Sequence, residues 1–292
     1  MIESKDTSLE YINAVINNRL KKGLRIDCLL DDYFVYKDKS FNIFLGLDNV
    51  GKTNWTMWYI TCLVKIHKKK FIIWSGENGS GQLMRDMLQF WTGEYLRNIT
   101  NLSQLHKHIT KYVTFVDNSK VYDHRTLLKI FADTDADACV IDPYTGLNHD
   151  RKISSQFDRN YNFCNDVRQF CNISGKTLFM SIHPQTEAAR RVYDNGNPLS
   201  GHIQPPRKAD CEGGQVFPNR CDNLICIHRY VSHKELYDLT MIHVYKVKDK
   251  ETGGRPTNIG EPLGFDFNNG LGFTIGGKNP LKIKNNNSKL KL

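Results

Sequence analysis

The chain has 292 residues, of which 40% are hydrophobic, 24% charged and 11% aromatic. This composition excludes the disordered and fibrous classes and predicts a folded globular protein, most simply with one large domain. The sequence has no run of about 18 uncharged apolar residues, and its opening residues, MIESKDTSLE, lack the basic and apolar regions of a signal peptide. We therefore expect no membrane span and a cytoplasmic protein.

The net charge is strongly positive, at +9 with an isoelectric point near 9.0. Such a charge suits a polyanionic partner such as nucleic acid, because neutralised phosphates release counterions. The simpler alternative is that the charge only keeps the protein soluble.

The cysteines are scattered and include no C-x-x-C pair, which argues against a disulfide framework. Cys221, Cys226 and His228 lie near one another in the sequence, but their spacing matches no common zinc site. We expect buried, reduced thiols at all eight positions: Cys28, Cys62, Cys139, Cys164, Cys171, Cys211, Cys221 and Cys226.

The opening segment predicts an amphipathic helix that ends near Gly23. Its apolar stripe needs a partner, which is either its own domain or a neighbouring subunit. The stripe consists of Leu9, Ile12, Val15, Ile16 and Leu20.

Short apolar runs then alternate with longer helical stretches. The runs are nearly continuous in apolar character, as in strands that are covered on both faces. The alternation favours an α/β fold with a mainly parallel central sheet flanked by helices. The predicted strands are 41–47, 71–77, 112–117, 138–142 and 176–183, and the predicted helices lie at about 53–67, 80–98, 123–133 and 155–172.

The pattern changes in the last third of the chain. Residues 184–220 are rich in Pro, Gly and Arg and poor in apolar periodicity, which predicts a long, mobile excursion. Two further strands are predicted at 223–230 and 240–249, and a terminal β-hairpin at 263–269 and 272–275.

These elements divide the chain into three parts. We expect a linker-like amphipathic helix at 1–25 and one ATPase-type domain at 26–277. The tail at 278–292 is basic and rich in Asn, which predicts disorder.

Residues 46–53, GLDNVGKT, match the phosphate-binding pattern G-x-x-x-x-G-K-[ST] in full. The segment follows an apolar strand and opens a helix, as the pattern requires. The loop N–H groups and the helix amino terminus favour phosphate, Lys52 is expected on the β and γ oxygens, and Thr53 on magnesium. The predicted nucleotide-binding residues are Gly46, Leu47, Asp48, Asn49, Val50, Gly51, Lys52 and Thr53.

Two carboxylates complete the predicted site for Mg²⁺ and ATP or another nucleoside triphosphate. Asp142 ends an apolar strand, so it is placed to share the metal with Thr53. Glu77 ends the strand after the phosphate loop helix, at the same sheet edge, and is the candidate base for the attacking water. The simpler reading of both is a polar residue in a turn.

The order of the segments GLDNVGKT, WSGEN, VIDPYTGL and FMSIHPQTE resembles the DnaB-like replicative helicases of the RecA superfamily, with their phage and mitochondrial primase-helicase relatives. The resemblance covers about residues 10–276. It implies a RecA-like P-loop NTPase fold with Glu77 as catalytic base. It also implies that His183 senses the γ-phosphate and communicates with DNA.

The resemblance continues beyond His183. The segment EGGQ, which ends at Gln215, looks like the family's DNA-facing loop. Lys246 and Lys248 look like the basic pair that reaches into the neighbouring subunit's nucleotide site, although many relatives have Arg at the second position, and a lysine offers a point charge rather than a planar fork. Arg229 is a rival for this role.

Two basic loops, at about 149–157 and 185–215, are candidates to follow DNA phosphates, and the alternative is that their charges only face solvent. The candidate DNA-binding residues are Arg151, Lys152, Arg190, Arg191, Arg207, Lys208 and Gln215.

The leading hypothesis is an ATP-driven helicase that translocates on single-stranded DNA during replication as a homo-hexameric ring with nucleotide between subunits. A primase or loader protein is a further candidate partner, and the cytoplasm of a phage host or a bacterial nucleoid would suit this role equally. Two alternatives stay open: a RecA-like recombination or repair ATPase that forms filaments, and a nucleotide-switched regulatory ATPase.

Overall fold

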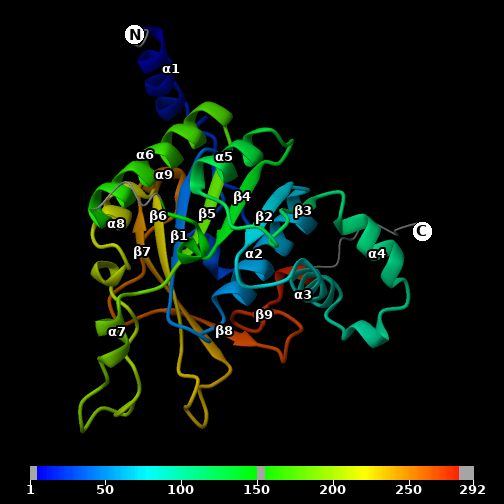
Figure 1. Ribbon diagram of the computed structural model, residues 1–292, viewed down its shortest axis with the longest axis vertical. Coiled ribbons are helices and arrows are strands. Elements are labelled where there is room, and N and C mark those ends of the chain that lie inside the picture. Colours follow the sequence, from blue (N-terminus) through cyan, green and yellow to red (C-terminus); the bar gives the residue numbers. More distant parts are fainter. Residues whose placement is uncertain (1–4, 150–154, 283–292) are drawn as a thin grey trace.

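The computed structural model describes residues 5–149 and 155–282 (Figure 1). Within these ranges nine strands form one sheet in the order β3-β2-β4-β5-β1-β6-β7-β8-β9. The strands from β3 to β6 in this order are parallel, and β7, β8 and β9 extend the sheet in antiparallel pairing. The strands are β1 (Phe41–Leu45), β2 (Phe71–Ser75), β3 (Val113–Phe115), β4 (Ala138–Asp142), β5 (Thr177–Ile182), β6 (Asn223–Arg229), β7 (Leu239–Val247), β8 (Leu263–Phe267) and β9 (Phe273–Thr274).

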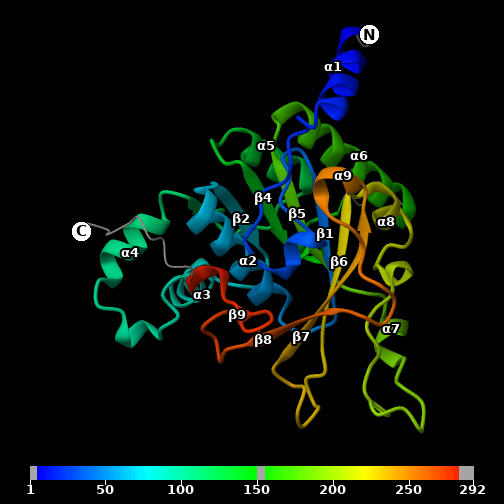
Figure 2. The ribbon, with the colours of Figure 1, turned by 180° about the vertical axis from the view of Figure 1, so that it is seen from behind.

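Helices cover both faces of the sheet (Figures 1 and 2). One face carries α2 and α3, and the other carries α5, α6 and α8. The α-helices are α1 (Lys5–Ile16), α2 (Lys52–His67), α3 (Ser80–Thr92), α4 (Leu102–Ile109), α5 (His124–Ala132), α6 (Gln156–Ser174), α7 (Thr186–Arg190), α8 (Val216–Arg220) and α9 (Lys250–Gly253), and the 3-10 turns are η1 (Leu29–Asp32), η2 (Leu96–Asn98), η3 (Tyr144–Gly146), η4 (Lys208–Asp210) and η5 (Pro280–Lys282).

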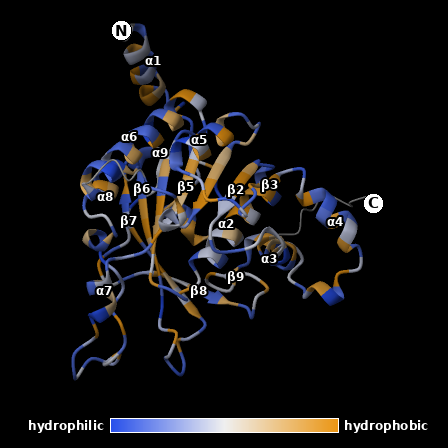
Figure 3. Ribbon diagram, in the orientation of Figure 1, coloured by the Kyte–Doolittle hydropathy of each residue, from blue (hydrophilic) through white to orange (hydrophobic). Residues whose placement is uncertain are grey.

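The central strands are apolar because both their faces are covered. β1, β2, β4 and β5 are buried at every position, and they form the hydrophobic centre of the molecule in Figure 3. This is the pattern expected of parallel strands between two helical layers. The predicted α/β fold with a mainly parallel sheet and a terminal β-hairpin is confirmed.

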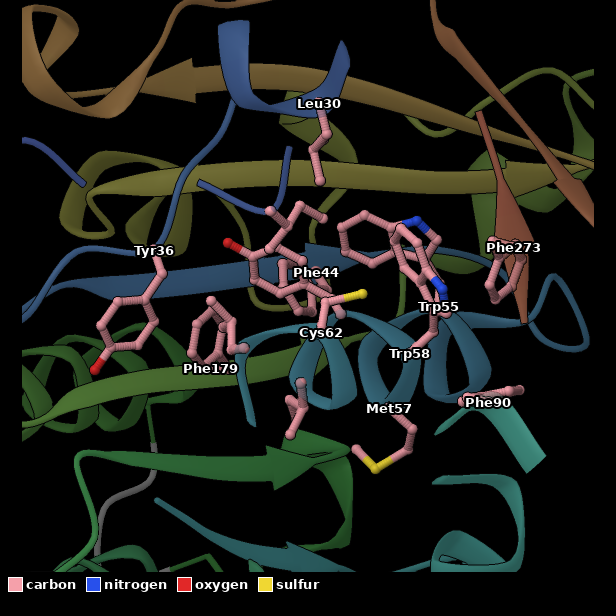
Figure 4. Packing of buried hydrophobic residues seen from close by; sticks show 14 of the residues in the cluster. Leu30, Tyr36, Phe44, Trp55, Met57, Trp58, Cys62, Phe90, Phe179 and Phe273 are labelled. Atoms are coloured by element: carbon pink, nitrogen blue, oxygen red, sulfur yellow. The ribbon is translucent and has the colours of Figure 1, made fainter. Parts of the chain in front are cut away.

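Aromatic side chains fill the layer between the sheet and α2 (Figure 4). Trp55 stacks on Tyr59 with ring centroids 5.6 Å apart and an interplanar angle of 4°, and Phe44 of β1 meets Trp55 edge-on at 5.4 Å. Such pairs add about 0.5–1.5 kcal/mol to the stabilisation that comes from burial. The packing fixes the start of α2 against the end of β1, which is where the phosphate loop lies.

The predicted strands agree with the structure to within two residues at each end, and three helix predictions are wrong in extent or omitted. The opening helix ends at Ile16 instead of near Gly23, because Asn18 adopts a left-handed φ of 53°. The helix expected at 80–98 stops at Thr92, because Gly93 takes a φ of 71°. The sequence did not predict α4.

Residues 184–220 contain more local structure than expected. They include α7 and α8, and isolated bridges join Pro184 to Cys211 and Val192 to Ile203. The beginning of the predicted tail also packs on the domain, since Leu281 is 3% exposed and its carbonyl accepts a hydrogen bond from Lys65 at 2.8 Å. The rest of the tail, 283–292, lies outside the described residues.

Helix α1 projects away from the body of the molecule (Figures 1 and 2). Its apolar side chains are between 42% and 73% exposed, so they do not pack on their own domain. Among the described residues, no helix is long and apolar enough to cross a bilayer.

The carboxyl end of α5 is tied to the sheet by Lys176. Its ammonium is buried and donates to the carbonyls of Phe131 at 2.7 Å and Ala132 at 3.2 Å. These carbonyls have no partner within the helix, so they depend on an outside donor. We predict that Lys176→Met lowers the free energy of unfolding by about 2–3 kcal/mol.

Urea denaturation measures this effect, and Lys129→Met on the exposed side of α5 is the matched control. The control should change stability by less than about 0.5 kcal/mol. Equal stability of the two variants would contradict the role given to Lys176.

Candidate nucleotide site

The phosphate loop connects the end of β1 to the start of α2, and its glycines are required by its shape. Gly51 has a φ of 88°. A Cβ atom on Gly46 would lie 2.5 Å from the Ile227 carbonyl oxygen of the neighbouring strand β6. The loop therefore lies close against the sheet, with its N–H groups and the amino terminus of α2 at the carboxyl edge.

Lys52 is buried inside this loop and is 8% exposed. Its ammonium donates to the carbonyls of Gly46 at 2.8 Å and Leu47 at 2.7 Å, and it lies 3.5 Å from Nδ1 of His183. Burial lowers the pKa of Lys52, and the nearby carboxylates, led by that of Asp48, oppose this shift. The ammonium is held where bound phosphate oxygens would compete with the loop carbonyls for it.

Thr53 and Asp142 meet as the sequence predicts. The Thr53 hydroxyl donates to one carboxylate oxygen of Asp142 at 2.9 Å, and the hydroxyl of Ser181 on β5 donates to the other. A hydroxyl and a carboxylate are hard oxygen ligands that suit Mg²⁺, which takes its remaining ligands from water and nucleotide phosphates. The sequence analysis missed Ser181, although its position two residues before His183 puts it on the β5 face next to Asp142.

His183 lies between two carboxylates that come from different loops. Its Nδ1 is 2.9 Å from Asp48 of the phosphate loop, and its Nε2 is 3.9 Å from Glu77. The Glu77 side chain is 59% exposed and faces the cavity. Asn78, also missed, has its N–H on the Ser75 hydroxyl at 3.0 Å, which orients the turn that carries Glu77.

These side chains line one cavity of about 500 Å³ at the carboxyl edge of the sheet. The size and the mixture of loop N–H groups, cation and carboxylates suit a nucleoside triphosphate. The lining residues are Asp48, Asn49, Gly51, Lys52, Thr53, Asn54, Glu77, Asn78, Asp142, Pro143, His183 and Arg229.

Arg229 belongs to the cavity of its own chain. It ends β6, and its guanidinium donates to the Asn49 carbonyl of the phosphate loop at 3.0 Å. Burial lowers the pKa of Arg229, but the guanidinium keeps its charge at neutral pH. The structure thus places the rival finger residue beside its own phosphate loop.

Lys246 and Lys248 lie on one side of β7, as their spacing predicts, and neither lines the cavity. The ammonium of Lys246 donates to the carbonyls of Pro218 at 2.7 Å, Asn219 at 3.2 Å and Cys221 at 2.7 Å, at the end of α8. Lys248 is 61% exposed, with its ammonium 3.5 Å from Asp222. A partner subunit would therefore find Lys248 more available than Lys246.

The predicted DNA-binding cations differ in how far they are neutralised. Arg190 pairs with Glu187 at 3.3 Å, and Arg191 forms a forked pair with Asp210. Arg207, Lys208 and Gln215 are exposed, and within the described ranges Arg207 and Lys208 have no ion pair. Arg151 and Lys152 lie outside the described residues.

A chain of hydrogen bonds links the metal-side loop to the predicted DNA loop. The Tyr144 hydroxyl donates to the Asn160 side chain at 2.8 Å, and the Asn160 amide donates to the Gly213 carbonyl at 3.2 Å. Gly213 has a φ of 90°, and a Cβ there would collide with Asn160 at 2.1 Å. The sequence gave no signal for Asn160, because its role depends on how α6 packs.

The eight cysteines are free and buried, as expected. In the part of the chain that the structure describes, no three His, Cys, Asp or Glu residues form a metal-binding group. Cys221, Cys226 and His228 thus make no zinc site.

Comparison with known proteins identifies the fold. No family model matches the chain, and no curated protein matches its sequence. The solved ATPase domain of a DnaB-like helicase superposes with a TM-score of 0.74 at 11% identity, over 94% of this chain and 99% of that one. A DnaB-like replicative helicase solved with reference to its primase interactions gives 0.67 at 12% identity, over 94% and 67%. The chain therefore has the RecA-like fold of DnaB-like helicase ATPase domains.

Proposed function

We propose that the chain is the ATP-dependent motor of a DnaB-like DNA helicase that translocates on single-stranded DNA as a ring during replication. The observation that carries the proposal is the convergence of Lys52, the Thr53 and Asp142 pair, Glu77 and His183 on one nucleotide-sized cavity. This set occurs in the fold of helicase ATPase domains.

Each side chain has a distinct task in hydrolysis. Lys52 leaves the Gly46 and Leu47 carbonyls and neutralises the β and γ phosphate oxygens. Thr53 and Asp142 would hold Mg²⁺, which supplies charge neutralisation at the phosphates. Glu77 accepts the proton of the attacking water.

His183 couples the nucleotide to the segment that follows it. In the absence of nucleotide it pairs with Asp48 at 2.9 Å. A γ-phosphate attracts the same imidazole, so binding and hydrolysis change the partner of His183. Because His183 directly precedes residues 184–220, this exchange is passed to the basic loop proposed to hold DNA.

The ring places nucleotide between subunits. The unpartnered apolar stripe of α1 offers a contact for a neighbouring subunit. Lys248, and Lys246 once it leaves the α8 carbonyls, supply positive charge to the neighbour's phosphates. Arg229, which contacts Asn49, acts on the nucleotide of its own chain.

We predict that the protein unwinds a forked DNA duplex with ATP and Mg²⁺, and that Glu77→Gln binds ATP but hydrolyses it at least about 100-fold more slowly, because an amide cannot accept the proton. Fluorescent unwinding and phosphate-release assays measure both activities. Glu94→Gln, on the exposed turn after α3, is the control and should keep normal turnover.

Near-normal turnover of Glu77→Gln would assign the base to another residue. Strand exchange without unwinding would favour the filament-forming recombinase, and assembly without DNA-stimulated hydrolysis would favour the regulatory ATPase.

A mixing experiment tests which residues act across the subunit interface. Lys52→Ala protein and Lys246→Ala/Lys248→Ala protein should each be inactive but recover hydrolysis when mixed, because about a quarter of the interfaces in random rings then pair an intact loop with intact lysines. Phosphate release from verified mixed rings is the measurement.

The matched mixture contains Lys52→Ala and Arg229→Ala proteins. It should stay inactive, since no cavity then holds both Lys52 and Arg229. Recovery in this mixture, with none in the lysine mixture, would make Arg229 the finger and contradict our assignment.

A further inference from the structure

A second cavity, of about 580 Å³, lies on the opposite side of the β6 and β7 strands from the nucleotide site. Its walls come from β6, β7, residues 193–208 and residues 257–262. We name it the tyrosine pocket after the six lining residues used below: Tyr193, Arg207, Lys208, Tyr230, His243 and Tyr245.

The tyrosines present aromatic surface to the pocket, because their hydroxyls are already used. The Tyr193 and Tyr230 hydroxyls lie 2.9 Å apart in a hydrogen bond, and the Tyr245 hydroxyl donates to the Pro206 carbonyl at 2.7 Å. What remains for a ligand is the ring surface of the partly exposed Tyr193 and Tyr245. Aromatic surface of this kind stacks on nucleobases.

Arg207 and Lys208 supply the positive charge of the pocket. Of the four cations predicted to bind DNA in this segment, Arg190 and Arg191 are matched by carboxylates. Arg207 and Lys208 are exposed and form no ion pair with any residue that the structure describes. They are therefore free to bind a phosphate at the rim of an aromatic pocket.

His243 adds an unsatisfied polar group to the wall. It is 7% exposed, and its Nε2 has no hydrogen-bond partner among the described residues. Burial lowers the pKa of His243 to about 4, so the imidazole is neutral near pH 7. A buried polar atom without a partner is rare in a folded protein, which suggests that this wall meets a ligand or water.

The combination excludes simpler ligands. A free inorganic anion makes no use of aromatic rings, and a purely apolar ligand gains nothing from two uncompensated cations. A nucleotide unit uses both, with its base on the rings and its phosphate on the cations.

We propose that the tyrosine pocket binds one nucleotide of single-stranded DNA, with the base against Tyr193 and Tyr245 and the phosphate at Arg207 and Lys208. This inference rests on the proposed function and adds base contact to it. The base contact is independent of sequence, because every base has a face that can stack.

The pocket is joined to the nucleotide site in two ways. Arg229 and Tyr230 are consecutive, and their side chains reach opposite sides of the sheet, into the nucleotide cavity and the tyrosine pocket. The segment that carries Tyr193 and Arg207 begins at His183, and its base is closed by the pair of Arg191 and Asp210. A base held in the pocket would therefore bias the position of both Arg229 and His183.

Binding of two labelled oligonucleotides tests the proposal. One is oligodeoxythymidylate, and the other has the same length and backbone but lacks bases. Tyr193→Ala should weaken binding of oligodeoxythymidylate at least about 10-fold and leave the abasic strand within about 2-fold, since only stacking is lost. Arg207→Ala/Lys208→Ala should weaken both and flatten the salt dependence.

Two controls separate stacking from folding. Tyr193→Phe keeps the ring and should bind oligodeoxythymidylate within about 3-fold of the unchanged protein. Tyr95→Ala removes a 38% exposed tyrosine beyond α3, on the other side of the sheet, and should not alter binding. Thermal unfolding confirms that each variant is folded.

Photocrosslinking identifies the source of the nucleotide. An oligonucleotide with 5-iododeoxyuridine should crosslink to the peptide that contains Tyr193 or Tyr245. A crosslink formed only by free 5-iododeoxyuridine monophosphate would overturn the assignment to a DNA strand.

The outcomes distinguish this inference from the proposed function. If the unchanged protein binds neither oligonucleotide, the helicase proposal fails. If it binds and hydrolyses ATP in response to DNA, but Tyr193→Ala discriminates bases as before, only the pocket assignment fails. A loss of ring assembly in Tyr193→Ala, seen by native mass measurement, would make the pocket a subunit contact and would also overturn it.

Discussion

The parallel order β2-β4-β5-β1-β6 is the constraint on which the rest of the structure depends. In parallel strands all carboxyl ends lie at one edge, so the residues that end these strands must meet there. Glu77 follows β2, Asp142 ends β4, His183 follows β5, the phosphate loop follows β1, and Arg229 ends β6. Five segments that are distant in the sequence thereby surround one cavity.

Sequence could predict the parts of this arrangement that local pattern controls. The buried strands are recognisable because they are apolar on both faces, and the phosphate loop because its glycines and Lys52 have fixed spacing. The orientation of Arg229 and the capture of Lys246 by the α8 carbonyls were not predictable. They depend on the pairing of β6 with β1 and β7, which has no local signal, and the same is true of Ser181 and Asn160.

The nucleotide site is connected to distant surfaces by side chains that reach it from two directions. His183 joins the phosphate loop to residues 184–220, and Tyr144, Asn160 and Gly213 join the Asp142 loop to the end of the same segment. A change at the phosphates would therefore act on this segment at both ends. A motor needs this kind of coupling between hydrolysis and the surface that grips its track.

The most direct test is a structure of the protein with Mg²⁺ and a non-hydrolysable ATP analogue. The account predicts that the Lys52 ammonium leaves the Gly46 and Leu47 carbonyls for the β and γ phosphates. It also predicts that Thr53 and Asp142 face the metal and that His183 exchanges Asp48 for the γ-phosphate. A nucleotide bound elsewhere, with Lys52 still on the loop carbonyls, would contradict it.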